Sequence, residues 1–198
     1  MLFLKINKEM YKMILSKNKL KEYYNKMPSN KNYEKRFFEI SKTYDIFISH
    51  SYLDKTEIEA LYYIFEECGY TVFIDWKQEE LQDRNEVSKE VANKLRKYMA
   101  NCKSLLYVST KNSSNSKWCP WELGFVDGLN GRVAILPILN EENNKYKGQE
   151  YLGIYPYVDF EKVKDTENYE FWINDPDNPE KYSRLKKWIE DGELHKYS

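Results

Sequence analysis

The segment Ser104-Leu-Leu-Tyr-Val-Ser109, followed by polar residues 110–115 and by Ser116-Lys-Trp-Cys-Pro-Trp-Glu-Leu-Gly124, guides the interpretation of the whole chain. The apolar run predicts a buried strand, and the apolar residues after Ser116 recur at helical spacing. Ser116 is suited to cap that helix, and Pro120 is tolerated only in a first turn. The segment therefore predicts a buried strand, a loop and the start of a helix.

Trp118 and Glu122 lie four residues apart, so on a helix they share one face. An indole can stack on a flat cationic heterocycle. A carboxylate near a helix N-terminus is favoured in its ionised form and stabilises positive charge at a sugar carbon when an N-glycosidic bond breaks. The alternative is structural: the Trp packs in the core and the Glu interacts with the helix dipole. These two residues alone leave both interpretations open.

Strand and helix patterns alternate on both sides of this segment. Capping-box spacings at Asp54-Lys-Thr-Glu57 and Asp83-Arg-Asn-Glu86 predict two helix starts. Gly69 and Gly131 are expected to end the helices that precede them. The expected strands cover residues 44–49, 70–75, 104–109, 132–139 and 154–160, with Pro156 placing the last one at a sheet edge. Apolar strands separated by helices predict an α/β fold: a flavodoxin-like, doubly wound, five-stranded parallel sheet of order 2-1-3-4-5.

This strand order predicts a crevice at the carboxyl ends of the first and third strands. His50 and Ser51 follow the first strand, Trp76 follows the second, Ser109 ends the third and Glu122 comes after it. Every unusual polar side chain noted so far is therefore expected on one rim of the sheet.

Composition limits the classes of protein that fit. The chain has 198 residues, 32% charged and 41% hydrophobic, and its apolar runs are too short to cross a membrane. Cys68, Cys102 and Cys119 lack metal-ligand spacing and fit reduced thiols in a cytoplasmic protein. We expect no metal site, no membrane partner and, because no basic-aromatic module is present, no nucleic-acid partner.

Residues outside the predicted sheet form two flanks. Residues 1–43 carry 11 Lys or Arg against 4 Glu, in a chain of net charge −1. This basic, partly helical extension, with helices expected over 7–27 and 33–40, is expected to pack on its own acidic body. Docking, dimerisation and pairing with a partner remain open for it. Residues 161–178 are expected to be irregular, and a helix over 179–191 closes the chain within a C-terminal segment, 161–198, that packs on the domain.

Other proteins of this architecture can be excluded by motif. The loop after the first strand, Ser49-His-Ser-Tyr-Leu-Asp54, contains no glycine. A dinucleotide-binding Rossmann domain needs G-x-G-x-x-G there, and a P-loop also needs glycines.

Residues 44–160 resemble a Toll/interleukin-1 receptor (TIR) domain, of the bacterial stand-alone kind. The matching pieces are Tyr44-Asp-Ile-Phe-Ile-Ser-His-Ser51, Gly69-Tyr-Thr-Val-Phe-Ile-Asp75, Leu105-Leu-Tyr-Val-Ser109, Ser116-Lys-Trp-Cys-Pro-Trp-Glu-Leu123 and Val133-Ala-Ile-Leu-Pro-Ile138. Trp118 and Glu122 fall on the family's W-x-x-x-E pattern. The chain is similar in this respect to the TIR component of Thoeris-type antiphage systems.

The resemblance implies an NAD⁺ glycohydrolase or ADP-ribosyl cyclase that needs no cofactor beyond NAD⁺ as its substrate. Glu122 would be the catalytic carboxylate. Residues expected to contact or border the substrate are Trp118, His50, Ser51, Trp76, Lys77 and Ser109. Implied partners are further copies of the TIR domain and an effector protein that senses the product. Residues 76–88 lack the glycine that the family often has in this loop, which bears on assembly through it.

Two other functions stay open at this level. One is a non-enzymatic TIR–TIR interaction or adaptor module, against which the intact Trp118 and Glu122 weigh. The other is an enzyme like the nucleoside deoxyribosyltransferases, which share this architecture and N-glycosidic chemistry.

Overall fold

A mixed sheet of eight strands crosses the molecule within the residues that the structure describes, which are 15–27, 42–75, 88–139 and 150–196 of a computed structural model. Its strand order is β2-β1-β3-β4-β5-β6-β7-β8. The parallel strands are β1 (Tyr44–Ser49), β2 (Val72–Phe73), β3 (Cys102–Ser109), β4 (Val133–Pro137) and β5 (Tyr157–Lys162). The antiparallel strands are β6 (Tyr169–Asn174), β7 (Lys181–Arg184) and β8 (His195–Lys196). The α/β class and the order of the five parallel strands are as predicted.

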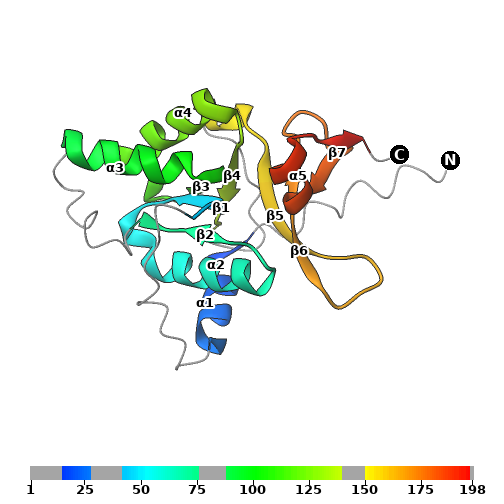
Figure 1. Cartoon of the computed structure of the whole chain (residues 1–198). Coiled ribbons are helices and arrows are strands. Elements are labelled where there is room, and N and C mark those ends of the chain that lie inside the picture. The colour runs from blue at the N-terminus through cyan, green and yellow to red at the C-terminus, as the bar shows by residue number, and fades with distance from the viewer. Residues whose placement is uncertain (1–14, 28–41, 76–87, 140–149, 197–198) are drawn as a thin grey trace.

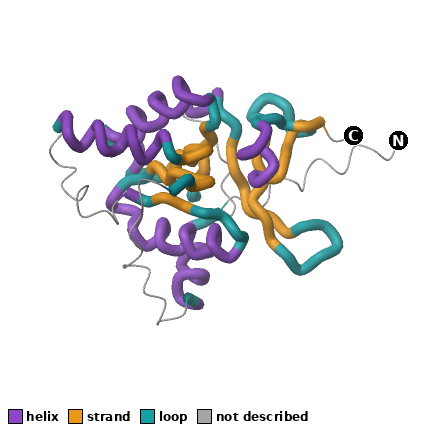
Figure 2. Tube along the Cα trace, viewed as in Figure 1, coloured by secondary structure: helices purple, strands orange, loops and turns teal. Residues whose placement is uncertain are grey.

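Helices cover both faces of the parallel strands (Figures 1 and 2). The described α-helices are α1 (Lys17–Lys26), α2 (Lys55–Glu67), α3 (Lys89–Ala100), α4 (Trp118–Asn130) and α5 (Leu185–Asp191). Short 3₁₀ turns are η3 (Tyr52–Asp54), η6 (Ser113–Asn115) and η7 (Glu150–Ile154). In the view of Figure 1, α3 and α4 lie above the sheet and α1 and α2 below it. The apolar strands are thus buried from both sides, as their sequences require.

The C-terminal segment extends the sheet, and two expectations about it were wrong. Residues 161–178 include β6, in which Phe171 and Ile173 are buried and alternate with partly exposed neighbours. The Phe171 ring stacks on Phe65 of α2 with centroids 4.0 Å apart, so β6 belongs to the main core. The expected helix over 179–191 begins only at Leu185, because residues 181–184 pair with β6 as β7.

The fifth strand was wrongly expected at an edge, since β5 lies between β4 and β6. Pro156 precedes β5 rather than interrupting it, and its carbonyl accepts a hydrogen bond from the Ile135 N–H at 2.8 Å. A proline lacks only the donor, so at this position it removes no hydrogen bond from the sheet.

The helix start predicted at Asp54 is confirmed in position, because Asp54 is the N-cap residue of α2, but its side chain makes no capping bond. The start predicted at Asp83 lies outside the described residues, and the described helix α3 begins at Lys89 with Ser88 as its cap. Gly69 and Gly131 follow α2 and α4 with φ of +80° and +65°, as predicted for helix-ending glycines.

The N-terminal extension docks on the body where it is described. Ser16 caps α1, and Leu15 and Leu20 are 2% and 1% exposed in the common core. The Lys17 N–H donates to the Leu139 carbonyl at 2.8 Å, and the Leu139 N–H donates to the Leu15 carbonyl at 2.9 Å. Of the helix expected over 7–27, residues 7–14 lie outside the described part, as does the one expected over 33–40.

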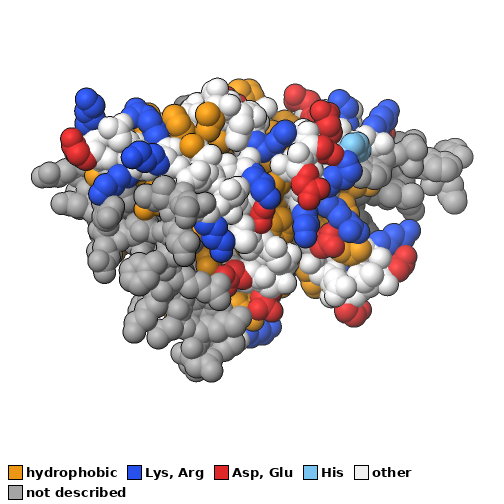
Figure 3. All heavy atoms as spheres, in the orientation of Figure 1, with side chains coloured by type: hydrophobic (Ala, Val, Ile, Leu, Met, Phe, Trp, Pro, Cys, Tyr) orange, Lys and Arg blue, Asp and Glu red, His pale blue; other side chains and the backbone are white. Residues whose placement is uncertain are grey.

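Charged side chains of both signs alternate over α5 and β7 (Figure 3). Ion pairs link Arg184 to Glu170 at 3.1 Å and Lys196 to Glu180 at 3.1 Å. These pairs are exposed, so each contributes little to stability.

Asp45 connects three parallel strands near their amino ends through hydrogen bonds. Its carboxylate should therefore make the stability of the fold depend on pH. Its carboxylate accepts hydrogen bonds from Lys103 at 2.8 Å and from the Thr71 hydroxyl at 2.8 Å. Burial raises the pKa of the Asp45 carboxyl, but these hydrogen bonds outweigh burial and hold the pKa below its ordinary value of 3.8. A group with a lowered folded-state pKa contributes stability above its ordinary pKa and loses it as the pH falls through the folded value.

We therefore expect Asp45→Asn to lower the free energy of unfolding by about 1 kcal/mol at pH 7. The gap between variant and wild type should shrink as the pH is lowered below 3.8. Thermal midpoints of both proteins across that range measure it, and a gap independent of pH would contradict the assignment.

Candidate active site

Glu122 lies at the carboxyl end of the first strand, held by a side chain that the sequence analysis missed. The Ser49 hydroxyl donates to Glu122 Oε2 at 2.6 Å, and both residues are buried, with Glu122 0% exposed. Ser49 is the last residue of β1, and Glu122 lies in the second turn of α4. Ser49 could have been found from sequence, because it directly precedes the loop that was already assigned to the rim.

The start of α4 brings Trp118 beside Glu122 on one buried face, as the four-residue spacing predicts. The Ser116 hydroxyl accepts a hydrogen bond from the Cys119 N–H at 3.2 Å, which is a capping contact one residue before the helix boundary at Lys117. Pro120 therefore lies in the first turn, where it is tolerated. The Trp118 ring is 8% exposed and meets the Trp121 ring edge to face, with centroids 5.4 Å apart.

The loop after β1 supplies His50 and Ser51, both buried. His50 Nδ1 lies 3.1 Å from the Ile48 carbonyl, which can only accept, so this nitrogen carries the proton. His50 Nε2 lies 3.7 Å from Asp75 Oδ1, next to the end of β2. The Ser51 hydroxyl accepts from the Leu53 N–H at 3.4 Å and so caps the turn η3.

A second buried cluster ties the loops after β1 and β3 together. Asp54, which is 0% exposed, accepts hydrogen bonds from the Thr110 hydroxyl at 2.6 Å and from Asn112 Nδ2 at 2.7 Å. Thr110 Oγ1 also accepts from the N–H groups of Asn112 and Ser113. We call Asp54, Thr110 and Asn112 the loop-bridging cluster. Sequence analysis missed it, because it had assigned Asp54 to a helix cap.

The structure brings most of the predicted rim residues to the same end of the sheet. Ser109 ends β3 opposite Pro137 of β4, and Ser49 pairs with Tyr107 one strand away. Trp76 and Lys77 lie outside the described residues. A cavity of about 530 Å³ lies elsewhere, between α1, α2 and the β5–β6 hairpin. The Glu122 region is the stronger candidate for an active site, because it combines a buried carboxylate with the convergence of strand ends.

The Ser49 hydrogen bond gives a prediction about alignment. Ser49→Ala removes the hydroxyl that holds Glu122 Oε2, so we expect about tenfold lower turnover of the substrate. Ser104→Ala is the matched control: the Ser104 hydroxyl is equally buried but donates to the Asp45 carbonyl at 2.7 Å. Each variant should lose about 1–3 kcal/mol of stability, and only Ser49→Ala should lose turnover. Equal turnover of the two variants would contradict the alignment role.

Comparison with known proteins places this site in a family. A family model described as "TIR domain" matches residues 46–173, more than half of the chain. The chain belongs to the TIR domain family. The TIR match continues past residue 160 into β6, which agrees with the packing of that strand on the core.

Two relatives share the TIR sequence over long segments. The probable 3′ cyclic ADP-D-ribose synthase ThsB′ of Bacillus cereus (strain MSX-D12) is 44% identical over 161 residues, covering 81% of this chain and 80% of the relative. The putative cyclic ADP-D-ribose synthase TIR2 of Cytobacillus dafuensis is 31% identical over 102 residues, covering 51% of this chain and 27% of the relative. A solved structure of TIR domains in the activated Roq1 resistosome aligns with a TM-score of 0.37 and 24% identity, over 49% of this chain and 57% of that one.

Two kinds of feature are not found in the part of the TIR protein that the structure describes. No helix there is long and apolar enough to cross a membrane. No group of three or more His, Cys, Asp or Glu side chains there is arranged to hold a metal ion.

Proposed function

We propose that this TIR protein cleaves the bond between nicotinamide and ribose in NAD⁺ and produces cyclic ADP-ribose as a signal in antiviral defence. The observation that carries the proposal is Glu122, a buried carboxylate fixed by Ser49 at the carboxyl ends of the parallel strands. The names of the relatives support the same chemistry, since both are described as cyclic ADP-D-ribose synthases. The proposed enzyme class is an NAD⁺ nucleosidase with ADP-ribosyl cyclase activity.

The reaction needs an anion more than it needs an acid. When the C1′–N bond breaks, its electron pair leaves with nicotinamide, which departs neutral, and positive charge develops at the ribose carbon. A fixed carboxylate at that carbon stabilises the transition state, and exclusion of water strengthens the interaction. Attack by a group of the same molecule, with loss of one proton, gives cyclic ADP-ribose; attack by water gives linear ADP-ribose.

The residues divide this work by position. Glu122 stabilises the developing charge, Ser49 holds the carboxylate, and Trp118 contributes a flat ring for the nicotinamide. The remaining residues proposed to border the substrate are His50, Ser51, Trp76, Lys77 and Ser109. Of these, His50 and Ser51 already make local hydrogen bonds that fix their orientation.

Burial of the site adds a condition to the proposal. Glu122 has no exposed surface and Trp118 is only 8% exposed. We infer that the described conformation is a resting one and that turnover requires a rearrangement that uncovers both side chains. Self-association through the TIR domain would supply it, and an effector protein that senses the product would act downstream.

Incubation of the concentrated protein with NAD⁺, followed by mass spectrometry of the small molecules, tests the proposal. We expect nicotinamide together with a cyclic ADP-ribose. A parallel incubation with a deoxynucleoside separates this activity from deoxyribosyl transfer, which would release the base from that substrate instead. Release of neither base, over a protein concentration range that includes assembled material, would leave a non-enzymatic TIR module and overturn the proposal.

A further inference from the structure

The first turn of α1 reaches the loop-bridging cluster next to the candidate site. Lys17 Nζ lies 3.8 Å from Asp54 Oδ1 and 3.1 Å from Glu57 Oε1. The Lys17 side chain is 32% exposed, whereas that of Asp54 is 0% exposed. Lys17 therefore places a positive charge on the solvent-facing side of the buried Asp54 carboxylate.

The backbone of Lys17 is fixed before its side chain reaches Asp54. Its N–H and the Leu15 carbonyl both pair with Leu139, which follows β4, in a parallel bridge centred on Ser16. An exposed ion pair usually contributes little, because two long side chains must be ordered to form it. Here the backbone of the lysine is anchored and its partner is buried. Removing the cation would leave a buried anion without that compensation.

The loop-bridging cluster connects to both sides of the Ser49–Glu122 hydrogen bond. Asp54 ends the turn η3, which is capped by Ser51, two residues beyond Ser49. Through Thr110 it also holds η6, which ends at Asn115, three residues before α4 begins. Asp54 is therefore tied to both the segment that carries the donor and the segment that leads to the acceptor of the 2.6 Å hydrogen bond.

We propose that Lys17 is a positioning residue, through which the N-terminal helix α1 sets the alignment of Ser49 with Glu122. The inference rests on the proposed function for its catalytic consequence, but the positioning itself concerns only the loops. It gives the N-terminal extension a role in the candidate site, beyond docking and stability.

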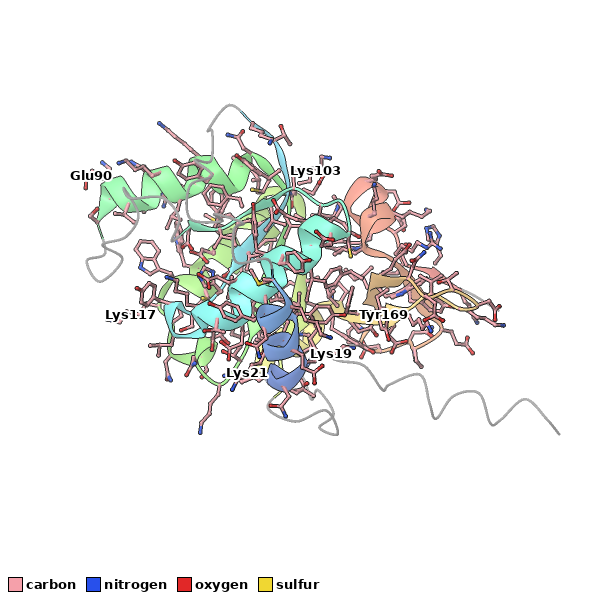
Figure 4. All side chains as sticks on the ribbon, turned by 90° about the horizontal axis from the view of Figure 1, so that it is seen from below. Lys19, Lys21, Glu90, Lys103, Lys117 and Tyr169 are labelled. Atoms are coloured by element: carbon pink, nitrogen blue, oxygen red, sulfur yellow. The ribbon has the colours of Figure 1, made fainter. Side chains whose placement is uncertain are left out.

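Lys17→Met tests this, because it keeps the unbranched stem of the side chain and removes the charged group. We expect the kcat for nicotinamide release to fall about fivefold, with KM changed less than about twofold, since no substrate contact is lost. Lys17→Arg, which keeps the charge, should restore most of the rate. Lys21→Met is the matched control on the same helix, because Lys21 is exposed. Figure 4 labels Lys21 on the opposite side of α1 from Lys19, whose Nζ lies 5.2 Å from the centroid of the Tyr169 ring.

Two measurements separate the routes by which Lys17 could act. Glu57→Gln removes the negative charge from the 3.1 Å contact between helices α1 and α2 but leaves Asp54 in place, so it should keep the wild-type rate. Hydrogen exchange at the Asn112 and Ser113 amides, which donate to Thr110 Oγ1, should accelerate about fivefold in Lys17→Met and in neither control.

The exchange measurement needs no turnover, so it decides the positioning role even if wild-type protein fails to cleave NAD⁺ and the proposed function falls. Unchanged exchange in Lys17→Met would overturn the proposal. So would an equal effect of Glu57→Gln or Lys21→Met, which would assign the change to the helix surface. Loss of the folded state in Lys17→Met would overturn it as well, because Lys17 would then act through stability alone.

Discussion

Glu122→Gln should lower nicotinamide release about a hundredfold or more while the protein keeps its fold. The substitution keeps the size of the side chain and an oxygen that can accept from Ser49, but it removes the negative charge that the transition state requires. Substrate binding should change little, because the neutral contacts of the ground state persist. The expected signature is therefore a loss in kcat at nearly constant KM.

The stability of this variant separates catalysis from structure. A buried carboxylate costs free energy to desolvate, so a neutral amide at position 122 should unfold at the same temperature as wild type or slightly higher. The test measures two properties of Glu122→Gln: its rate of nicotinamide release, under conditions in which the wild type turns over, and its thermal midpoint. Full turnover by Glu122→Gln would refute the catalytic assignment, and an unfolded variant would return Glu122 to a structural role.

Leu20→Ala should lower the free energy of unfolding by about 3 kcal/mol. Leu20 is 1% exposed on α1, within the same core as the parallel strands, so truncation leaves a cavity there. For a chain of this size, the loss corresponds to a fall in the thermal midpoint of roughly 10 °C. Scanning calorimetry or circular dichroism measures it.

Tyr24→Ala is the control, because Tyr24 lies on the same helix and is 38% exposed. Its midpoint should change by no more than about 2 °C. Equal midpoints for Leu20→Ala and wild type would show that α1 can detach without cost. That outcome would contradict the docking of residues 15–27 on the body, which the burial of Leu15 and Leu20 indicates.

The parallel half of the fold could be predicted from sequence because its signals are local. Each of its strands is an apolar run, and the first was predicted with its observed bounds, Tyr44–Ser49. Helix-ending glycines are equally local, since only glycine adopts a positive φ without strain. The order 2-1-3-4-5 followed from the alternation of strands and helices.

The antiparallel half was missed because its sequence carries both strand signals and loop signals. β6 alternates buried Phe171 and Ile173 with half-exposed neighbours, which is a strand pattern, but it lies among Asp, Asn and Pro residues that indicate loops. β7 has the sequence Lys-Tyr-Ser-Arg, and its pairing is decided by β6 rather than by its own composition.

In the candidate site, spacing could predict the shared face of Trp118 and Glu122, but not their partners. The bond between Ser49 and Glu122 joins residues 73 positions apart. The bond between Thr110 and Asp54 joins residues 56 positions apart. Contacts of this kind depend on tertiary packing, which overrides local preference; Asp54 has the sequence of a cap and the environment of a buried cross-link.

The two outermost strands described in the sheet, β2 and β8, are each only two residues long. So short a row of unpaired backbone groups is a poor template for a strand of another molecule. If copies of this protein assemble, their contacts must therefore come from side chains on helices and loops rather than from a continuous sheet. Single surface substitutions or added salt would dissociate such an assembly. Unlike a cross-β fibre, it would also dissociate when its stimulus is withdrawn.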